Sequence, residues 1–331
     1  DGGSDFSVRI RSGAVAVRSL TANAKLILQG GTLTASQGIE VNTRFDIEGG
    51  TVVATTISSQ TGVTTTVTGD ASLSGVTLAS DLVVSSFHTI NLTNGLTLAD
   101  GAQLIVGTDQ TPGGISYIGS QTIGGIGSLV FANSANYYNY LSSANGPGTL
   151  TLDTGVTVLL QGNAYLSGYN DTNRLINKGR IVMDGVSPSV GLSYLDNQGT
   201  VEVRNGYLDL RGALSSVTGR LVISGGLLSV SSPISSTELR QAIYETLVDI
   251  AGSDADVLPG GARLTGGGFG GSIVALADAL AETVSSVSID VLHGVEGAEE
   301  EFDAPAYVAS KDEDWQMRRA VELEAALEAR G

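Results

Sequence analysis

Three segments in the second half of the chain repeat at a constant interval of about 20 residues. They are Gly179 to Asp184, Gly199 to Arg204 and Gly219 to Ser224, each a short alternating run that begins with glycine. An earlier pair, Leu28 to Ala35 and Ile47 to Ala54, repeats at nearly the same interval. A fixed interval of this size is typical of proteins in which each repeat stacks on the next.

Superposing the three repeats places apolar residues in columns. Ile181, Val201 and Leu221 fall in one column, and the alternate residues face the other way, because side chains alternate along a strand. We therefore predict a mainly β fold for residues 1–233, a parallel β-helix with rungs of about 20 residues. Glycine and asparagine would provide the positive φ at the corners. An antiparallel β-sandwich built from hairpins is the alternative.

The charge of the chain is unevenly distributed. The 331 residues have a net charge of −17 and contain no cysteine. Residues 1–233 hold 11 basic and 15 acidic residues, and residues 234–331 hold 6 and 19. The acidic last third argues against nucleic acid and anionic membranes as partners. No apolar run reaches the length of a membrane span, and a thiol nucleophile or zinc–thiolate site is excluded.

The repeat region resembles bacterial exported surface proteins of the autotransporter-passenger type. The resemblance lies in Ile176 to Ile181 and in Asn197 to Val203 followed by Asn205 to Leu210. It implies a right-handed β-helix, export, and a place outside the cell or on the bacterial cell surface. It implies architecture more than activity.

The sequence changes character after Pro233. Ser235 to Glu238 has the form of a capping box, and the following apolar residues, from Leu239 to Ile250, have helical spacing. The end of the chain, from Asp312 onward, also has a helical pattern. We therefore predict a small α/β segment over residues 234–331.

The block from Gly261 to Gly271 resembles the third motif of the GHMP kinases, most closely galactokinases, and the resemblance extends over about residues 237–310. It implies a nucleotide-supporting loop with these glycines: Gly266, Gly267, Gly268, Gly270 and Gly271. The nearest match to the family's phosphate cradle, Arg211 to Ser216, lacks its proline and lies within the β-repeat. A sugar kinase remnant or fusion that binds ATP and Mg²⁺ is therefore an alternative, and the leading interpretation needs no cofactor.

Tyrosines are concentrated in the middle of the chain, where eight of the ten lie between Tyr117 and Tyr207. The densest group contains Asn136, Tyr137, Tyr138 and Tyr140. Aromatic faces beside asparagine amides are suited to binding a glycan by stacking and hydrogen bonding. The alternative is a loop whose rings only cover the side of a rung.

Other chemistry has weaker support in the sequence. His88 is expected to be an ordinary strand residue without a carboxylate partner. Asp46 and Glu48 share a strand face, but the equivalent positions one repeat earlier are Ile27 and Gln29, so the carboxylate pair expected of a polysaccharide-cleaving β-helix is not evident. Asp184 beside Arg204 suggests an ion pair between rungs. The sequence assigns no catalytic residue and no metal site.

These observations favour a structural or adhesive protein. Its expected partners are a surface glycan or further copies of itself stacked end to end, because the last rung of a β-helix leaves an open strand edge. A polysaccharide-active enzyme is the other alternative.

Overall fold

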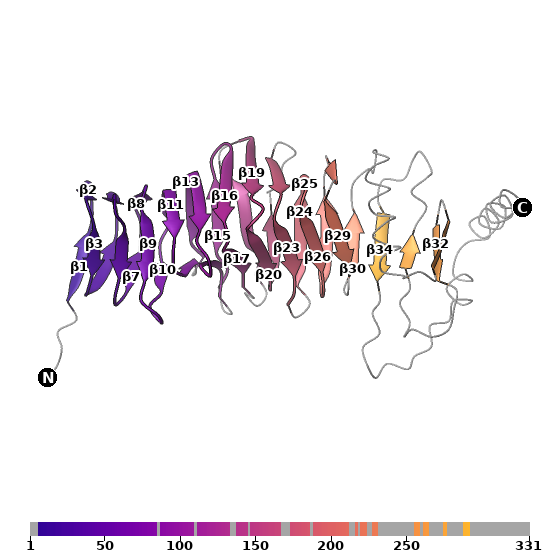
Figure 1. Cartoon of the computed structure of the whole chain (residues 1–331), viewed down its shortest axis with the longest axis horizontal. Helices are drawn as coiled ribbons and strands as arrows, with labels where there is room; N and C mark the ends of the chain where they lie inside the picture. The colour runs from indigo at the N-terminus through magenta and orange to yellow at the C-terminus, as the bar shows by residue number, and fades with distance from the viewer. Residues whose placement is uncertain are drawn as a thin grey trace, which may run out of the picture.

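The computed structural model describes most of the first 230 residues. It covers residues 6–230 except 85–86, 109–110, 133–136, 145, 167–172, 186–187, 212–215, 218 and 224–226. Of the remaining chain it describes four strands, at 255–258, 261–264, 274–276 and 287–291. Strands β1 to β30 cross the long axis of the molecule one after another, so the described coils form an elongated stack (Figure 1).

The stack has three faces, and each face is a column of parallel strands. The first face is a sheet of 11 strands. Its members are β1 (Ser7–Ile10), β4 (Lys25–Leu28), β7 (Phe45–Ile47), β10 (Thr65–Val67), β12 (Leu82–Val84), β14 (Gln103–Val106), β17 (Ser128–Phe131), β20 (Thr157–Leu160), β23 (Arg180–Met183), β26 (Thr200–Val203) and β29 (Arg220–Ile223). We number the coils 1 to 11 by these strands.

The second face follows the first corner of each coil. Its strands are β2 (Ala14–Val17), β5 (Thr32–Ala35), β8 (Thr51–Val53), β11 (Ala71–Leu78), β13 (Thr89–Leu98), β15 (Gly114–Tyr117), β18 (Asn139–Ser143), β21 (Ala164–Leu166), β24 (Ser189–Ser193), β27 (Tyr207–Arg211) and β30 (Leu227–Val230). Strands β11 and β13 are long enough to continue into the third face.

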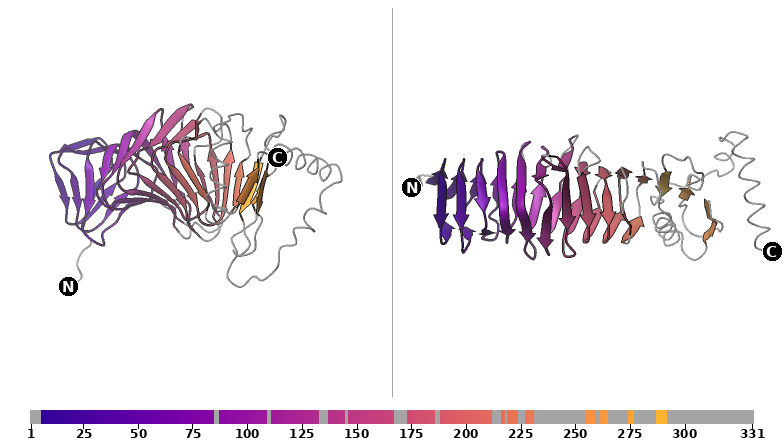
Figure 2. Two further views of the ribbon diagram at one scale, coloured as in Figure 1. Left: turned by 45° about the vertical axis from the view of Figure 1, so that its right-hand side comes forward. Right: turned by 90° about the horizontal axis from the view of Figure 1, so that it is seen from above.

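The third face completes each coil before the chain returns to the first. Besides the ends of β11 and β13, it consists of β3 (Leu20–Ala22), β6 (Ile39–Val41), β9 (Thr56–Ser59), β16 (Gln121–Gly125), β19 (Gly148–Leu152), β22 (Asn173–Asn177), β25 (Leu195–Asn197) and β28 (Ser216–Val217). Figure 2 shows the same succession of coils from the side and from above.

The register confirms the repeats read from the sequence. Ile181 pairs with Val201 and Val201 with Leu221, and Leu33 pairs with Val52. Every pairing between described strands of successive coils is parallel, which is the arrangement of a parallel β-helix. The antiparallel sandwich is therefore wrong for this region, and the right hand of the coil stays a prediction.

Apolar columns fill the interior of the stack. One inward column of the first face contains apolar residues that are each at most 1% exposed, among them Leu26, Phe45, Leu104, Leu129 and Val158. One polar residue, Thr65, interrupts this column between Phe45 and Leu82. Because each coil covers the core of the next, burial is continuous along the stack.

The repeated glycines have two roles, of which one was expected. Gly31 and Gly50, in the earlier pair of repeats, have the expected positive φ of 76°. Gly179, Gly199 and Gly219 do not have positive φ. A Cβ atom on Gly199 would lie 2.0 Å from the carbonyl oxygen of Gly179, and one on Gly219 would lie 2.1 Å from that of Gly199. These corners need glycine because successive backbones approach too closely for any side chain.

The repeated asparagines likewise do not provide positive φ. Asn177 and Asn197 are buried, and the Asn177 Nδ2 donates to Asn197 Oδ1 at 2.8 Å. The Asn197 Nδ2 in turn donates to the carbonyl of Arg220 at 3.1 Å. The two amides form a ladder at the corner between the third and first faces, in which the buried Asn177 Oδ1 has no hydrogen-bond partner among the described residues.

Ion pairs connect the outer surfaces of coils 9 and 10. Arg204 Nη1 lies 2.8 Å from Asp184 Oδ2, which confirms the expected pair between rungs. Arg204 also contacts Glu202 at 2.7 Å, and Arg180 binds the other oxygen of that carboxylate. The hydrogen bond from Arg204, followed by that from Arg180, holds the pKa of Glu202 below its usual range, although burial opposes the shift.

Beyond residue 230 the described strands pair in the antiparallel sense. They are β31 (Ala255–Leu258), β32 (Gly261–Leu264), β33 (Val274–Leu276) and β34 (Val287–Val291). Strand β34 lies antiparallel on β30 and so ends the parallel ladder of the second face. The strand expected after the glycine-rich block is present as β33, whereas the expected helices lie outside the described residues.

Candidate functional site

The corner between the first and second faces differs in length from coil to coil. In coils 2 and 3 this corner consists of residues 29–31 and 48–50, whereas in coils 6 and 7 it consists of residues 107–113 and 132–138. The interval between paired residues grows accordingly, because Ser128 pairs with Thr157, 29 positions later. The longer corner of coil 7 brings Tyr137 and Tyr138 onto the second face.

Five aromatic residues lie on or beside the second face over coils 5 to 8, and we call them the aromatic patch: Phe87, Tyr137, Tyr138, Tyr140 and Tyr165. The rings of Phe87 and Tyr137 meet edge to face, with centroids 5.2 Å apart. Those of Tyr138 and Tyr165 stack at 4.5 Å with 17° between their planes. Phe87 is 60% exposed, Tyr137 48% and Tyr138 38%. A group of aromatic rings with this exposure indicates a contact surface.

The patch is built on an outward-facing column. Thr89, Gly114, Tyr140, Tyr165 and Gly191 occupy successive coils in register. Their neighbours along the strands, such as Ile90, Ile115 and Leu141, are fully buried, so the column itself faces outward.

Tyr140 lies along the column rather than standing away from it. A Cβ atom on Gly114 would lie 2.2 Å from Cζ of Tyr140, so the ring crosses Gly114. The Tyr140 hydroxyl forms a short hydrogen bond with Thr89 Oγ1, two coils away. The absence of a side chain at Gly114 therefore determines the orientation of this tyrosine.

Phe87 is held in an unfavourable backbone conformation. Its φ is 64°, in the left-handed region that a bulky residue rarely adopts. The peptide N–H of Phe87 donates to the carbonyl of Pro112 at 2.9 Å, which anchors this turn to the next coil. A strained residue with an exposed aromatic side chain suggests a function that outweighs the strain.

His88 departs from the expectation of an unpaired strand residue. It precedes β13, and its Nδ1 lies 3.5 Å from Asp70 Oδ1. The same carboxylate accepts a hydrogen bond from the Thr89 N–H at 2.9 Å. The carboxylate partner was missed because Asp70 belongs to the preceding coil. The pair lies at the edge of the aromatic patch.

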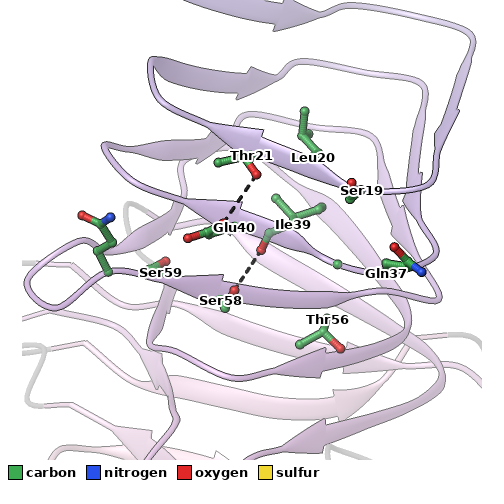
Figure 3. A pocket seen from close by; sticks show the side chains of 11 residues that line it. Ser19, Leu20, Thr21, Gln37, Ile39, Glu40, Thr56, Ser58 and Ser59 are labelled. Atoms are coloured by element: carbon green, nitrogen blue, oxygen red, sulfur yellow. Dashed lines mark hydrogen bonds between the residues drawn. The ribbon is translucent and has the colours of Figure 1, made fainter.

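A polar pocket lies on the third face, near the start of the stack (Figure 3). Its lining residues are Ser19, Leu20, Thr21, Gln37, Gly38, Ile39, Glu40, Thr56, Ser58, Ser59 and Gln60. Thr21 Oγ1 donates to Glu40 Oε2 at 3.4 Å, and Ser58 Oγ donates to the carbonyl of Ile39 at 3.3 Å. Glu40 is the one carboxylate of this lining, whereas glycoside hydrolysis uses two.

The remaining carboxylates of the early coils are held in structural contacts. Asp46 is 3% exposed and binds Lys25 at 2.8 Å and Arg44 at 2.7 Å. Glu48 accepts a hydrogen bond from Gln29 Nε2 at 2.7 Å. Within the described ranges, no group of three or more metal-binding side chains is found.

The structure brings together three of the four residues predicted to bind a glycan. Tyr137, Tyr138 and Tyr140 belong to the aromatic patch, whereas Asn136 lies outside the described residues. Phe87 and Tyr165 were missed. Tyr165 is the partner of Tyr140 in register, but the longer corner between them means that a search at the interval of the later repeats does not align them.

The glycines predicted to support a nucleotide lie outside the described residues. Gly266, Gly267, Gly268, Gly270 and Gly271 all lie beyond the described residues, and binding of ATP and Mg²⁺ there stays a prediction. None of the described segments is a helix of the length and apolar character that crossing a bilayer requires.

The first coil exposes residues that the other coils bury. Val8 is 57% exposed and Val17 37%, although their partners in register, Leu26 and Ala35, are at most 1% exposed. Phe6, directly before β1, is 77% exposed. This end of the described stack is therefore apolar.

Comparison with family models, with curated proteins and with solved structures finds no match for the chain.

Proposed function

We propose that this chain is a structural, adhesive β-helix protein of the bacterial cell surface or extracellular space, and that its aromatic patch binds carbohydrate. The observation that carries the proposal is the exposure of Phe87, Tyr137 and Tyr138 together on the side of a stiff stack. Apolar rings gathered in water are unfavourable unless a ligand covers them. The C–H faces of sugars are suited to aromatic rings, and sugar hydroxyls to the hydroxyls of tyrosine.

The stack supports a binding role better than a catalytic one. Its continuous core makes each coil a rigid platform, so the rings are held in place before a ligand arrives. The carboxylates of Asp46 and Glu48 bind neighbouring side chains of the stack. An adhesive protein needs a rigid, repeated surface with a lateral contact, which is the arrangement of the aromatic patch.

Calorimetric titration with soluble polysaccharides tests the proposal. The Tyr138→Ala variant removes a ring that stacks on Tyr165, and we expect it to weaken binding about tenfold. The matched control is Ile126→Ala, which removes an apolar side chain that is 62% exposed and lies outside the patch. Equal loss of binding in both variants, or no binding by the wild-type chain, would contradict the proposal.

We also propose that a second copy of the chain pairs with the open edge of the first coil. Val8 and Val17 face inward but have no coil above them in the described structure, and such an edge is a template for another strand. The antiparallel strand β34 covers the other end of the second face. Sedimentation of the wild-type chain and of Val8→Lys across a range of concentrations tests this, because association should be lost in the variant. Identical, concentration-independent sedimentation of both would contradict it.

A further inference from the structure

Basic residues are missing from the whole middle of the chain. Between Arg44 and Arg174 the sequence contains neither lysine nor arginine. All five residues of the aromatic patch fall in this interval. The ionisable side chains with contacts at the edge of the patch are Asp70, whose carboxylate is exposed, and His88, whose Nδ1 lies 3.5 Å from it. The patch therefore offers aromatic rings and acceptor oxygens, and no permanent cation.

A second outward column runs beside the one that carries the tyrosines. Asn91, Ser116 and Ser142 are paired in register on coils 5, 6 and 7, two positions along the strands from Thr89, Gly114 and Tyr140. These short side chains carry neutral donors and acceptors. Ser116 is only 9% exposed, so Asn91 and Ser142 are the members that a ligand can reach. An aromatic column thus lies parallel to a neutral polar column, and both follow the axis of the stack.

The tyrosine rings of this column lie along the axis of the stack. Tyr140 and Tyr165 are adjacent in register, and the ring of Tyr140 lies over Gly114 whereas that of Tyr165 lies beside Gly191. Successive strands in a sheet are about 4.8 Å apart, so the two rings extend the column over several coils. A chain of sugars that follows the axis meets these aromatic and hydroxyl side chains repeatedly, whereas one that crosses the axis leaves the columns after a single coil.

From this arrangement we infer that the ligand of the patch is a neutral polysaccharide, extended along the axis of the β-helix, and that acidic polysaccharides are excluded. The inference rests on the proposed function and specifies the chemical class and orientation of its ligand. Carboxylate or sulfate groups on a bound polymer would lie near Asp70 with no lysine or arginine to neutralise them, and an unpaired charge is costly to desolvate. Neutral hydroxyls lose nothing comparable, because the amide of Asn91 and the hydroxyl of Ser142 can replace their bonds to water.

The test is a titration of the full chain with four probes: a soluble neutral β-glucan, a hexasaccharide and a disaccharide of the same linkage, and polygalacturonate. For the β-glucan and for the hexasaccharide, we expect the affinity to be unchanged between low salt and about 1 M salt, where the Debye length is about 3 Å. A disaccharide should bind at least about tenfold more weakly than the hexasaccharide, because it reaches fewer rings. Polygalacturonate should not bind.

A charge-introducing variant sharpens the test. Ser142→Lys places a cation beside Tyr140 on the outer surface, so it should confer binding to polygalacturonate that disappears at high salt. Asn91→Lys places a cation on the same column as Ser142 and serves as the second variant if Ser142→Lys fails to fold.

The outcomes separate the inference from the function on which it rests. Binding of polygalacturonate by the wild-type chain, lost in Tyr138→Ala, would leave a carbohydrate-binding patch and overturn the neutral class. Equal affinity for the disaccharide and the hexasaccharide would overturn the axial orientation. Failure of every probe to bind would overturn both the inference and the proposed function.

Discussion

The interior of the stack is similar in coils 2 and 3 and in coils 6 and 7, but the outer surfaces of these two pairs differ. In both pairs the inward columns are apolar and buried. In the early coils a short corner leads to an outer surface of threonines such as Thr32 and Thr51. In the later coils residues 107–113 and 132–138 lengthen the corner, and the second of these corners adds Tyr137 and Tyr138. The core tolerates such changes because the strands on either side keep their register, and loops are where binding residues accumulate.

The comparison predicts a large loss of stability for a substitution at one phenylalanine and no loss at another. Phe131 is fully buried in coil 7, and we expect Phe131→Ala to lower the free energy of unfolding by about 3–5 kcal/mol. Phe87→Gly should cost no stability, because relief of about 1–2 kcal/mol of left-handed strain offsets the entropy of glycine and the lost ring contact. Denaturant unfolding measures both. A loss above about 2 kcal/mol in Phe87→Gly would show that the patch is part of the core.

The corner glycines provide the next largest effect. In Gly199→Ala the new methyl group would lie 2.0 Å from a backbone oxygen that cannot move independently of its coil, so we expect a loss of about 1–3 kcal/mol. Gly124→Ala is the control, because its nearest contact is Asp153 Oδ2 at 3.9 Å and its φ is not positive. Thermal unfolding should separate the two variants by several degrees. Similar midpoints would show that the close approach at the repeated corner is not required.

A smaller effect, an increase in the free energy of unfolding, is expected for a substitution inside the core. The Oγ1 of Thr65 is buried and has no hydrogen-bond partner among the described residues. Thr65→Val keeps the shape and removes the unpaired hydroxyl, so it should raise the free energy of unfolding by about 1 kcal/mol. Thr66→Val, on the outward side of the same strand, is the control and should change little. A destabilised Thr65→Val would imply that this hydroxyl is paired in solution.

The smallest effect concerns pH. Because its partners hold the folded-state pKa of Glu202 below the ordinary value of 4.5, this carboxylate stabilises the fold above that pH and loses its contribution as the pH falls through the folded pKa. Glu202→Gln should therefore cost about 1 kcal/mol at pH 7 and nothing once Glu202 itself is protonated. Unfolding curves of both proteins from neutral to strongly acidic pH measure this. A difference that persists at the lowest pH would contradict the assignment.

The sequence was most informative where the interval between coils is constant. Ile181, Val201 and Leu221 could be aligned because each position of the coil recurs at that interval and must bury the same face. The role of Gly199 could not be predicted, since close approach of two backbones leaves the same glycine in the sequence as a positive φ. Phe87 and Tyr165 were missed because longer corners change the interval, and contacts across coils then have no fixed spacing. The contact between Asp70 and His88 was missed because the two residues belong to successive coils.

The central claim is that carbohydrate binds to the aromatic patch, and hydrogen–deuterium exchange with and without a neutral hexasaccharide tests it most directly. We predict slower exchange in the peptides that contain residues 87–92 and 137–143, with the buried strands of the first face unchanged. Protection confined to residues 37–60 around the polar pocket or to the glycine-rich block from Gly261 to Gly271, or no protection at all, would contradict the account.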